Sequence, residues 1–195
     1  MTQPIDKAGA RAAMKQTLAA VSPADWSRAS AAASSGIIAS DAFACAGVVA
    51  AFLALPSEID VEAVIAEALR RGKVVCLPRV VAGGTTMEMH RVRDISKDTL
   101  AGAIGVREPT ATLPVIEPNK VELVLVPGRA FTLAGERLGR GGGFYDAYLA
   151  RTKATRVGVG LGRQIIPALP RETHDQCVYA LATEAGLAWC CRTSM

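Results

Sequence analysis

The chain has 195 residues, of which 50% are hydrophobic and 21% are charged, and its formal net charge is +4. This length suits one domain that buries about 70% of the surface its unfolded chain would expose. The composition excludes a disordered or fibrous protein. The small net charge and an aromatic content of 5% do not indicate a nucleic-acid-binding face, although they suit an anionic small molecule. The five cysteines form no CxxC pair, which argues against a zinc site.

The longest uncharged apolar stretch runs from Ala42 to Leu55. Its fourteen residues fall short of the about 20 that cross a bilayer, so we expect a core segment and no membrane partner. The N-terminal residues are charged at helical spacing and contain no apolar core of a signal peptide. We therefore expect a single domain over residues 1–195 that acts in the cytoplasm as a monomer.

The first third of the chain predicts two helices followed by a βαβ unit. Residues 5–20 have helical charge spacing, and Ser22-Pro23-Ala24-Asp25 is a helix start that leads to a helix ending near Ser40. A buried strand is expected at 47–55, a helix capped by Asp60 at 61–71, and a second strand at 73–77. This order of elements is typical of a doubly wound sheet.

Four further strands are expected along the rest of the chain. Residues 86–92 alternate in a way that predicts a strand with one exposed face, which would carry His90 as a structural residue. The run 121–126 is apolar at nearly every position and suits a parallel strand buried on both faces. The other two strands are expected at residues 155–161 and 178–182. The predicted fold is α/β: a three-layer α/β/α single domain with a mostly parallel, doubly wound sheet.

A basic, glycine-rich loop follows the buried strand at 121–126, and ligands of such sheets bind at the carboxyl ends of the strands. Arg137 and Arg140 stand among glycines, and Gly141, Gly142 and Gly143 leave the backbone open to an anion. Free N–H groups and two guanidinium groups favour a polyphosphate. Asp146, in the short helix that begins at Phe144-Tyr145, suits Mg²⁺ bound to those phosphates. The plainer interpretation is a flexible turn with solvated arginines and an acid near a helix start.

The loop lies within a longer pattern, Pro127-Gly128-x-x-Phe131 and then Gly135-x-Arg137-Leu138-Gly139-Arg140-Gly141-x-Gly143-x-Tyr145-Asp146-x-x-Leu149. This pattern resembles the signature of the 5-formyltetrahydrofolate cyclo-ligase family, also called 5,10-methenyltetrahydrofolate synthetases. It implies a ligase that uses ATP and Mg²⁺ to convert 5-formyltetrahydrofolate to 5,10-methenyltetrahydrofolate, with release of ADP and phosphate. The folate substrate and ATP would be its partners, with no nucleic acid.

The resemblance also implies roles for individual residues. Arg140 and Tyr145 would be catalytic, Glu58 would contact the folate, and Asp146 and Asp175 would hold Mg²⁺. The nucleotide would contact Lys7, Arg11, Arg137, Leu138, Gly139, Arg140, Gly141, Gly142, Gly143, Phe144 and Tyr145. The folate would share Arg140, Gly141, Gly142, Gly143 and Phe144 with it.

The chain departs from the family pattern at three places. Phe144 replaces a common tyrosine, Tyr179 replaces a common aspartate, and the segment Leu161–Gln164 is one residue shorter than usual while retaining the glutamine. Two other functions are compatible with the same type of sheet: a nucleotide- or RNA-binding protein, and an enzyme related to sugar-phosphate isomerases or CoA-transferases.

Overall fold

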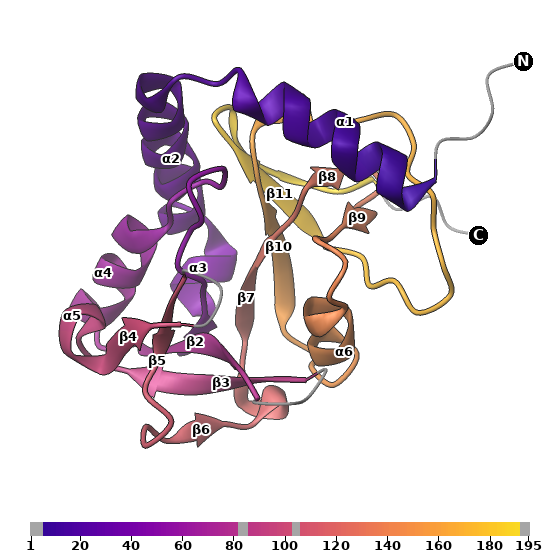
Figure 1. Ribbon diagram of the computed structural model, residues 1–195. Coiled ribbons are helices and arrows are strands. Elements are labelled where there is room, and N and C mark those ends of the chain that lie inside the picture. The colour runs from indigo at the N-terminus through magenta and orange to yellow at the C-terminus, as the bar shows by residue number, and fades with distance from the viewer. Residues whose placement is uncertain (1–5, 82–85, 103–105, 192–195) are drawn as a thin grey trace, which may run out of the picture.

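An eight-stranded sheet forms the centre of the molecule (Figure 1), with the strand order β12-β11-β10-β7-β1-β2-β3-β6. The computed structural model describes residues 6–81, 86–102 and 106–191. The five central strands from β11 to β2 are parallel, whereas β12, β3 and β6 join through antiparallel pairings. The strands are β1 Val48–Ala50, β2 Val74–Val80, β3 Met87–Val92, β6 Val115–Ile116, β7 Leu123–Pro127, β10 Thr155–Val159, β11 Ala180–Thr183 and β12 Gly186–Trp189.

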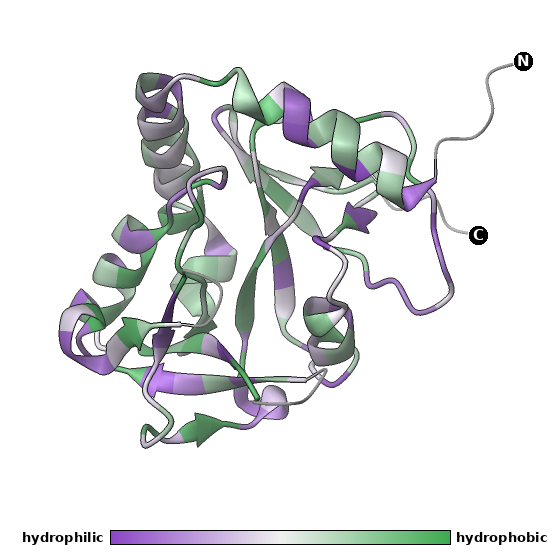
Figure 2. Cartoon of the chain, in the orientation of Figure 1, coloured by the Kyte–Doolittle hydropathy of each residue, from purple (hydrophilic) through white to green (hydrophobic). Residues whose placement is uncertain are grey.

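Helices cover both faces of the sheet because successive side chains of the buried strands point to opposite faces. In β7, Leu123 and Leu125 pack in the same core as α1, α2 and α4, whereas Val124 and Val126 pack in the core that contains α6. Figure 2 shows hydrophobic colours along β7. The helices are α1 Lys7–Ala19, α2 Pro23–Ile38, α3 Asp41–Cys45, α4 Glu62–Arg70, α5 Ile95–Asp98 and α6 Phe144–Leu149, with 3-10 turns η1 Pro118–Lys120 and η2 Gly162–Gln164.

Two small hairpins lie outside the main sheet. One pairs β4 Thr99–Ala101 with β5 Arg107–Pro109, and the other pairs β8 Ala130–Phe131 with β9 Arg137–Leu138. The prediction of a three-layer α/β domain with a mostly parallel sheet is confirmed. Its proposed boundaries, residues 1–195, remain a prediction. Within the described ranges, none of the helices is long and apolar enough to span a bilayer.

The capping and turn residues that the sequence predicts for the first helices and strands are found in the structure. The Ser22 hydroxyl accepts a hydrogen bond from Asp25 N at 3.1 Å and begins α2. The predicted βαβ unit is β1, α4 and β2, and its two strands pair in parallel. Gly72, with a φ of 73°, closes α4 before β2 begins. The expected first helix is α1, except that residue 5 lies outside the described residues.

The helix that starts at Pro23 ends at Ile38, near Ser40 as expected, and Ser40 caps a separate helix, α3. Two other expectations need correction. The strand expected at 47–55 is paired only at Val48–Ala50, and residues 51–53 continue as buried chain beyond the sheet. The face of β3 expected to be exposed is covered at His90, which is 3% exposed and contacts the Leu113 carbonyl through Nδ1 at 2.9 Å. His90 is therefore a buried structural residue.

The cysteines should differ sharply in reactivity. Cys76 is fully buried in β2, and this burial raises the pKa of its thiol to about 12, whereas Cys45 and Cys191 are exposed. The attacking species is the thiolate. At pH 8 we expect iodoacetamide to modify Cys45 and Cys191 in the native protein and to leave Cys76 unmodified until denaturant is added, as read by peptide mass spectrometry. Rapid native modification of Cys76 would contradict this burial.

Candidate active site

A cavity of about 700 Å³ lies beyond the carboxyl ends of the parallel strands. Its wall contains Phe52 and Leu53 after β1, Pro127 and Gly128 at the end of β7, and the loop that leads to α6. The structure brings every predicted site residue into this wall, namely Lys7, Arg11, Glu58, Arg137, Leu138, Gly139, Arg140, Gly141, Gly142, Gly143, Phe144, Tyr145, Asp146 and Asp175. Residues from the two ends of the sequence therefore meet at one site, and their individual roles remain predictions.

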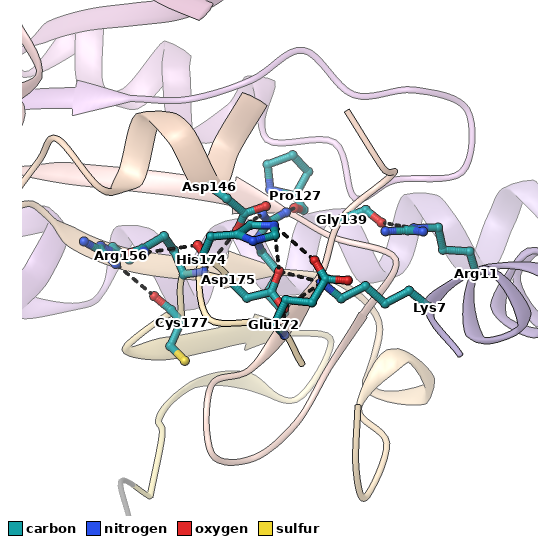
Figure 3. A network of polar contacts seen from close by, with 12 residues as sticks. Lys7, Arg11, Pro127, Gly139, Asp146, Arg156, Glu172, His174, Asp175 and Cys177 are labelled. Carbon is teal, nitrogen blue, oxygen red and sulfur yellow. Dashed lines mark hydrogen bonds and ion pairs between the residues drawn. The ribbon is translucent and has the colours of Figure 1, made fainter. Parts of the chain in front are cut away.

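The glycine-rich loop connects β9 directly to α6. Gly141 has a φ of 109° and Gly143 a φ of 68°, so the backbone turns twice through conformations that side chains with a Cβ rarely adopt. Arg11 of α1 donates from Nε to the Gly139 carbonyl at 2.9 Å and holds the start of the loop (Figure 3). The loop is therefore shaped by its glycines and anchored by a cation predicted to contact ATP.

Gly141 and Gly143 should respond differently to substitution. A φ of 109° is costly for any residue with a Cβ, whereas asparagine tolerates values near the 68° of Gly143. We expect Gly141→Ala to lower the free energy of unfolding by roughly 1–3 kcal/mol and Gly143→Asn by less than about 1 kcal/mol. Urea unfolding monitored by circular dichroism measures both. Equal losses would show that the loop relaxes around the new side chain.

A nearly buried ion pair joins Arg137 to Asp146. The Arg137 side chain is 3% exposed and the Asp146 side chain 15%, and Nη2 lies 2.8 Å from Oδ1. The same oxygen accepts the backbone N–H of Gln176 at 3.1 Å, while Arg137 Nη1 donates to the Pro127 carbonyl at 3.3 Å. This pair ties the end of β7 to the first turn of α6 and to the loop after Asp175.

Lys7 forms the second pair, with Asp175. Its Nζ lies 2.7 Å from Asp175 and 3.3 Å from Glu172, and Figure 3 shows it reaching from α1 towards both carboxylates. Partial burial by itself would raise the pKa of Asp175, but the hydrogen bond and charge of Lys7 hold that pKa below its usual range. Asp175 is therefore an ionised carboxylate at neutral pH. The cluster Glu172, His174 and Asp175 has ligand atoms within 4.8 Å of one another.

Arg140 forms the third pair, with Glu58. Arg140 donates from Nε to Glu58 Oε1 at 2.9 Å, and its Nη2 lies 2.8 Å from the same oxygen. The second carboxylate oxygen of Glu58 accepts the backbone N–H of Leu55 at 3.0 Å. The Arg140 side chain is 38% exposed and that of Glu58 10%, so the arginine can move away from its partner more easily.

Tyr145 contributes a buried hydroxyl to the cavity wall. This hydroxyl has no hydrogen-bond partner among the described residues. Burial, followed by the negative charge of Glu58, raises the pKa of Tyr145, so the group stays neutral and can donate a hydrogen bond. The Arg137 guanidinium lies 5.7 Å from the centre of the Tyr145 ring.

The three ion pairs give this site a definite charge arrangement. Lys7, Arg137 and Arg140, all predicted to contact phosphates, are each bound to a carboxylate predicted to contact metal or folate. Carboxylates are the ligands that Mg²⁺ prefers, so Asp146 and Asp175 suit this ion chemically. To bind the metal, each of these carboxylates would have to separate from the basic side chain with which it is now paired. That side chain would then be free to bind a phosphate.

Sequence reasoning missed the apolar half of the cavity. Its wall includes Phe52, Leu77, Pro78, Met87 and Val106, which come from several separate segments. Each of these residues reads as ordinary core in the sequence, and no local pattern separates a cavity wall from a filled core. For Phe52, Leu77 and Pro78 the signal available was their position near the carboxyl ends of predicted strands. Met87 and Val106 had no such signal.

Gln164 has a supporting role that the sequence left open. It is 2% exposed and donates from Nε2 to the carbonyls of Gly128 and Arg129, at 2.8 and 3.1 Å. Its carbonyl accepts the Leu161 N–H at 2.7 Å. The shortened segment Leu161–Gln164 therefore still holds the strand exit at Gly128, which lies in the cavity wall.

Comparison with known proteins decides the family. A sequence model described as the 5-formyltetrahydrofolate cyclo-ligase family matches residues 4–184. The chain belongs to the 5-formyltetrahydrofolate cyclo-ligase family. It is therefore a ligase of folate metabolism, and the prediction made from the loop signature is confirmed.

Individual relatives agree with this assignment over nearly the whole chain. The 5-formyltetrahydrofolate cyclo-ligase of Mus musculus is 29% identical, covering 88% of this chain and 90% of that protein. A probable cyclo-ligase of Caenorhabditis elegans is 30% identical over 87% of this chain and 88% of its own length. The NMR structure of Aquifex aeolicus 5,10-methenyltetrahydrofolate synthetase superposes with a TM-score of 0.84 at 30% identity, covering 97% of this chain and 94% of that one. The family fold thus extends through all the elements that form the cavity.

Proposed function

We propose that the protein converts 5-formyltetrahydrofolate to 5,10-methenyltetrahydrofolate in a reaction that consumes MgATP and releases ADP and phosphate. The observation that carries the proposal is the cavity itself, which combines a basic glycine loop with an apolar wall. The basic part suits a triphosphate, and the apolar part suits a flat heterocycle.

The nucleotide is placed along the basic side. Lys7, Arg11, Arg137 and Arg140 bind its phosphates together with the backbone from Leu138 to Tyr145. Glu58 contacts the folate, and the loop Arg140–Phe144 lies between the two substrates. Asp146 and Asp175 hold Mg²⁺, which would neutralise charge on the phosphate oxygens when bound.

The chemistry has two stages. The oxygen of the formyl group that N5 carries is a poor leaving group. The γ-phosphoryl group of ATP is therefore first transferred to this oxygen, and ADP is formed. N10 then attacks the formyl carbon and loses its proton, and the C–O bond breaks as phosphate leaves. In the first stage Arg140 stabilises the negative charge that develops on the transferred group. Tyr145 donates a hydrogen bond from its neutral hydroxyl where the phosphoryl group and the formyl oxygen meet.

A spectrophotometric assay tests the proposal. Purified protein is mixed with 5-formyltetrahydrofolate and MgATP, and the near-ultraviolet absorbance of the methenyl product is followed while ADP is measured. We expect product and ADP in equal amounts, and no product when ATP or Mg²⁺ is omitted. Product without ATP, or ATP hydrolysis without product, would contradict the proposed reaction.

The remaining features of the proposal are predictions carried from the sequence. We predict a monomer in the cytoplasm with no nucleic-acid or membrane partner. The mild net charge of +4 supports a small anionic substrate over a nucleic acid.

A further inference from the structure

The apolar half of the cavity contains one carboxylate that the proposed reaction does not use. Glu108 lies in β5, which packs against β2 and β3, and its side chain is 14% exposed in the cavity wall. The wall around this half also contains Leu77, Met87 and Val106. A charged group in such surroundings is costly unless it meets a partner.

Glu108 differs from the other acids of the cavity because neither of its carboxylate oxygens accepts a hydrogen bond from a described residue. Within residues 6–81, 86–102 and 106–191, none donates a hydrogen bond to its carboxylate, and the nearest cation is Arg79 Nη1 at 3.9 Å. That nitrogen instead donates to the Pro109 carbonyl at 2.6 Å. By contrast, the remaining carboxylates in the wall each lie within 3.3 Å of a donor, namely Asp6, Glu58, Asp146, Glu172 and Asp175.

The close packing at Gly102 leaves space for this side chain. A Cβ on Gly102 would lie 2.6 Å from the Val106 carbonyl oxygen, 2.8 Å from Glu108 Cγ and 2.9 Å from Cδ, closer than real Cβ contacts. A glycine at this position therefore makes room both for the backbone at Val106 and for the Glu108 side chain.

We infer that Glu108 recognises the 2-amino-4-oxopyrimidine ring of the folate through its N3–H and 2-amino groups. These two neighbouring N–H donors match the two oxygens of a carboxylate, as a guanidinium does. The low dielectric of the apolar half strengthens such a pair of hydrogen bonds. Glu58 is less suited to this role because one of its oxygens accepts the Leu55 backbone N–H, so it could offer at most one free oxygen to the ring even after Arg140 moves away. Glu108 is thus a specificity-determining residue for the pterin end, an inference that rests on the proposed folate substrate.

Direct binding of two ligands tests this role. Isothermal titration calorimetry without ATP compares 5-formyltetrahydrofolate with its 2-desamino-2-methyl analogue. We expect Glu108→Gln to weaken binding of the natural ligand by about 10- to 100-fold. We expect it to weaken the analogue less than about threefold, because the 2-amino group is already missing and the remaining N3–H can donate to the oxygen of the glutamine side chain. MgATP affinity should not change.

Two further variants separate recognition from structure. Glu88→Gln on β3 is a matched control, because Glu88 is 48% exposed and lies outside the cavity wall, and it should leave all affinities unchanged. Arg79→Met removes the nearest cation and should change both folate affinities less than threefold. Equal weakening of both ligands by Glu108→Gln, no weakening of either, or an equal effect of Arg79→Met would overturn the inference. Failure of the wild-type protein to bind 5-formyltetrahydrofolate would instead overturn the proposed function on which it rests.

Discussion

Replacing Arg140 by alanine is expected to lower kcat/KM for the cyclisation by about 10²- to 10³-fold. In the resting site Arg140 is bound to Glu58, and its 38% exposure lets it turn towards a phosphoryl group. The loss should fall mainly on kcat, because the guanidinium is proposed to meet charge that develops during transfer. Steady-state kinetics with MgATP and 5-formyltetrahydrofolate measure it.

Two comparisons make this prediction specific. Arg140→Lys should recover part of the activity, since the charge remains but the planar set of donors is lost. Arg28→Ala removes an arginine whose side chain is 78% exposed on α2, and it should have no effect. A loss confined to KM for folate, with kcat unchanged, would place Arg140 in substrate binding alone.

Replacing Arg137 by methionine is expected to lower the free energy of unfolding by about 3 kcal/mol, because it leaves the Asp146 carboxylate nearly buried without its cation. For a chain of this size this corresponds to a decrease in Tm of roughly 6–12 °C. The side chain of Arg137 is 3% exposed, so water cannot readily take the place of the guanidinium. Differential scanning calorimetry and urea unfolding measure the change.

A double-mutant cycle identifies the source of this loss. The double variant Arg137→Met/Asp146→Leu should be more stable than Arg137→Met alone, because no buried charge is left unpaired. The matched exposed pair of Arg28 and Asp25 should show almost no coupling in the same cycle. Additive losses for Arg137 and Asp146 would show that the pair does not act as a unit.

The paired state of the site has a consequence for ligand binding. Lys7 and Arg137 are held by the two carboxylates proposed as magnesium ligands. A divalent cation bound to Asp146 and Asp175 would free Lys7 and Arg137 to bind a triphosphate. A triphosphate bound to these two cations would in turn free both carboxylates to bind the divalent cation. Mg²⁺ and the nucleotide should therefore strengthen each other's binding.

The position of the site could be predicted because it is indicated by local sequence patterns. The apolar run that forms β7 ends at Pro127-Gly128, and the glycines that follow are required by backbone angles such as the 109° of Gly141. The cap at Ser22 and the turn at Gly72 were equally local. These features depend on neighbouring residues and can be read without knowing the fold.

Features that depend on distant residues could not be predicted. Glu58 and Arg140 were both expected in the site, but their contact joins residues 82 positions apart. The burial of His90 depends on the Leu113 carbonyl, which lies in a different segment of the chain. The short strand β12, Gly186–Trp189, has no strong pattern of its own and forms by pairing with β11. Tertiary contacts decide such features.

The transfer of phosphate to the formyl oxygen is the central claim, and an isotope measurement tests it most directly. 5-Formyltetrahydrofolate carrying ¹⁸O in the formyl group is converted in a single turnover with MgATP, and the released phosphate is analysed by mass spectrometry. The proposed chemistry predicts that the ¹⁸O label is recovered in inorganic phosphate. Unlabelled phosphate, with the label in water, would contradict it.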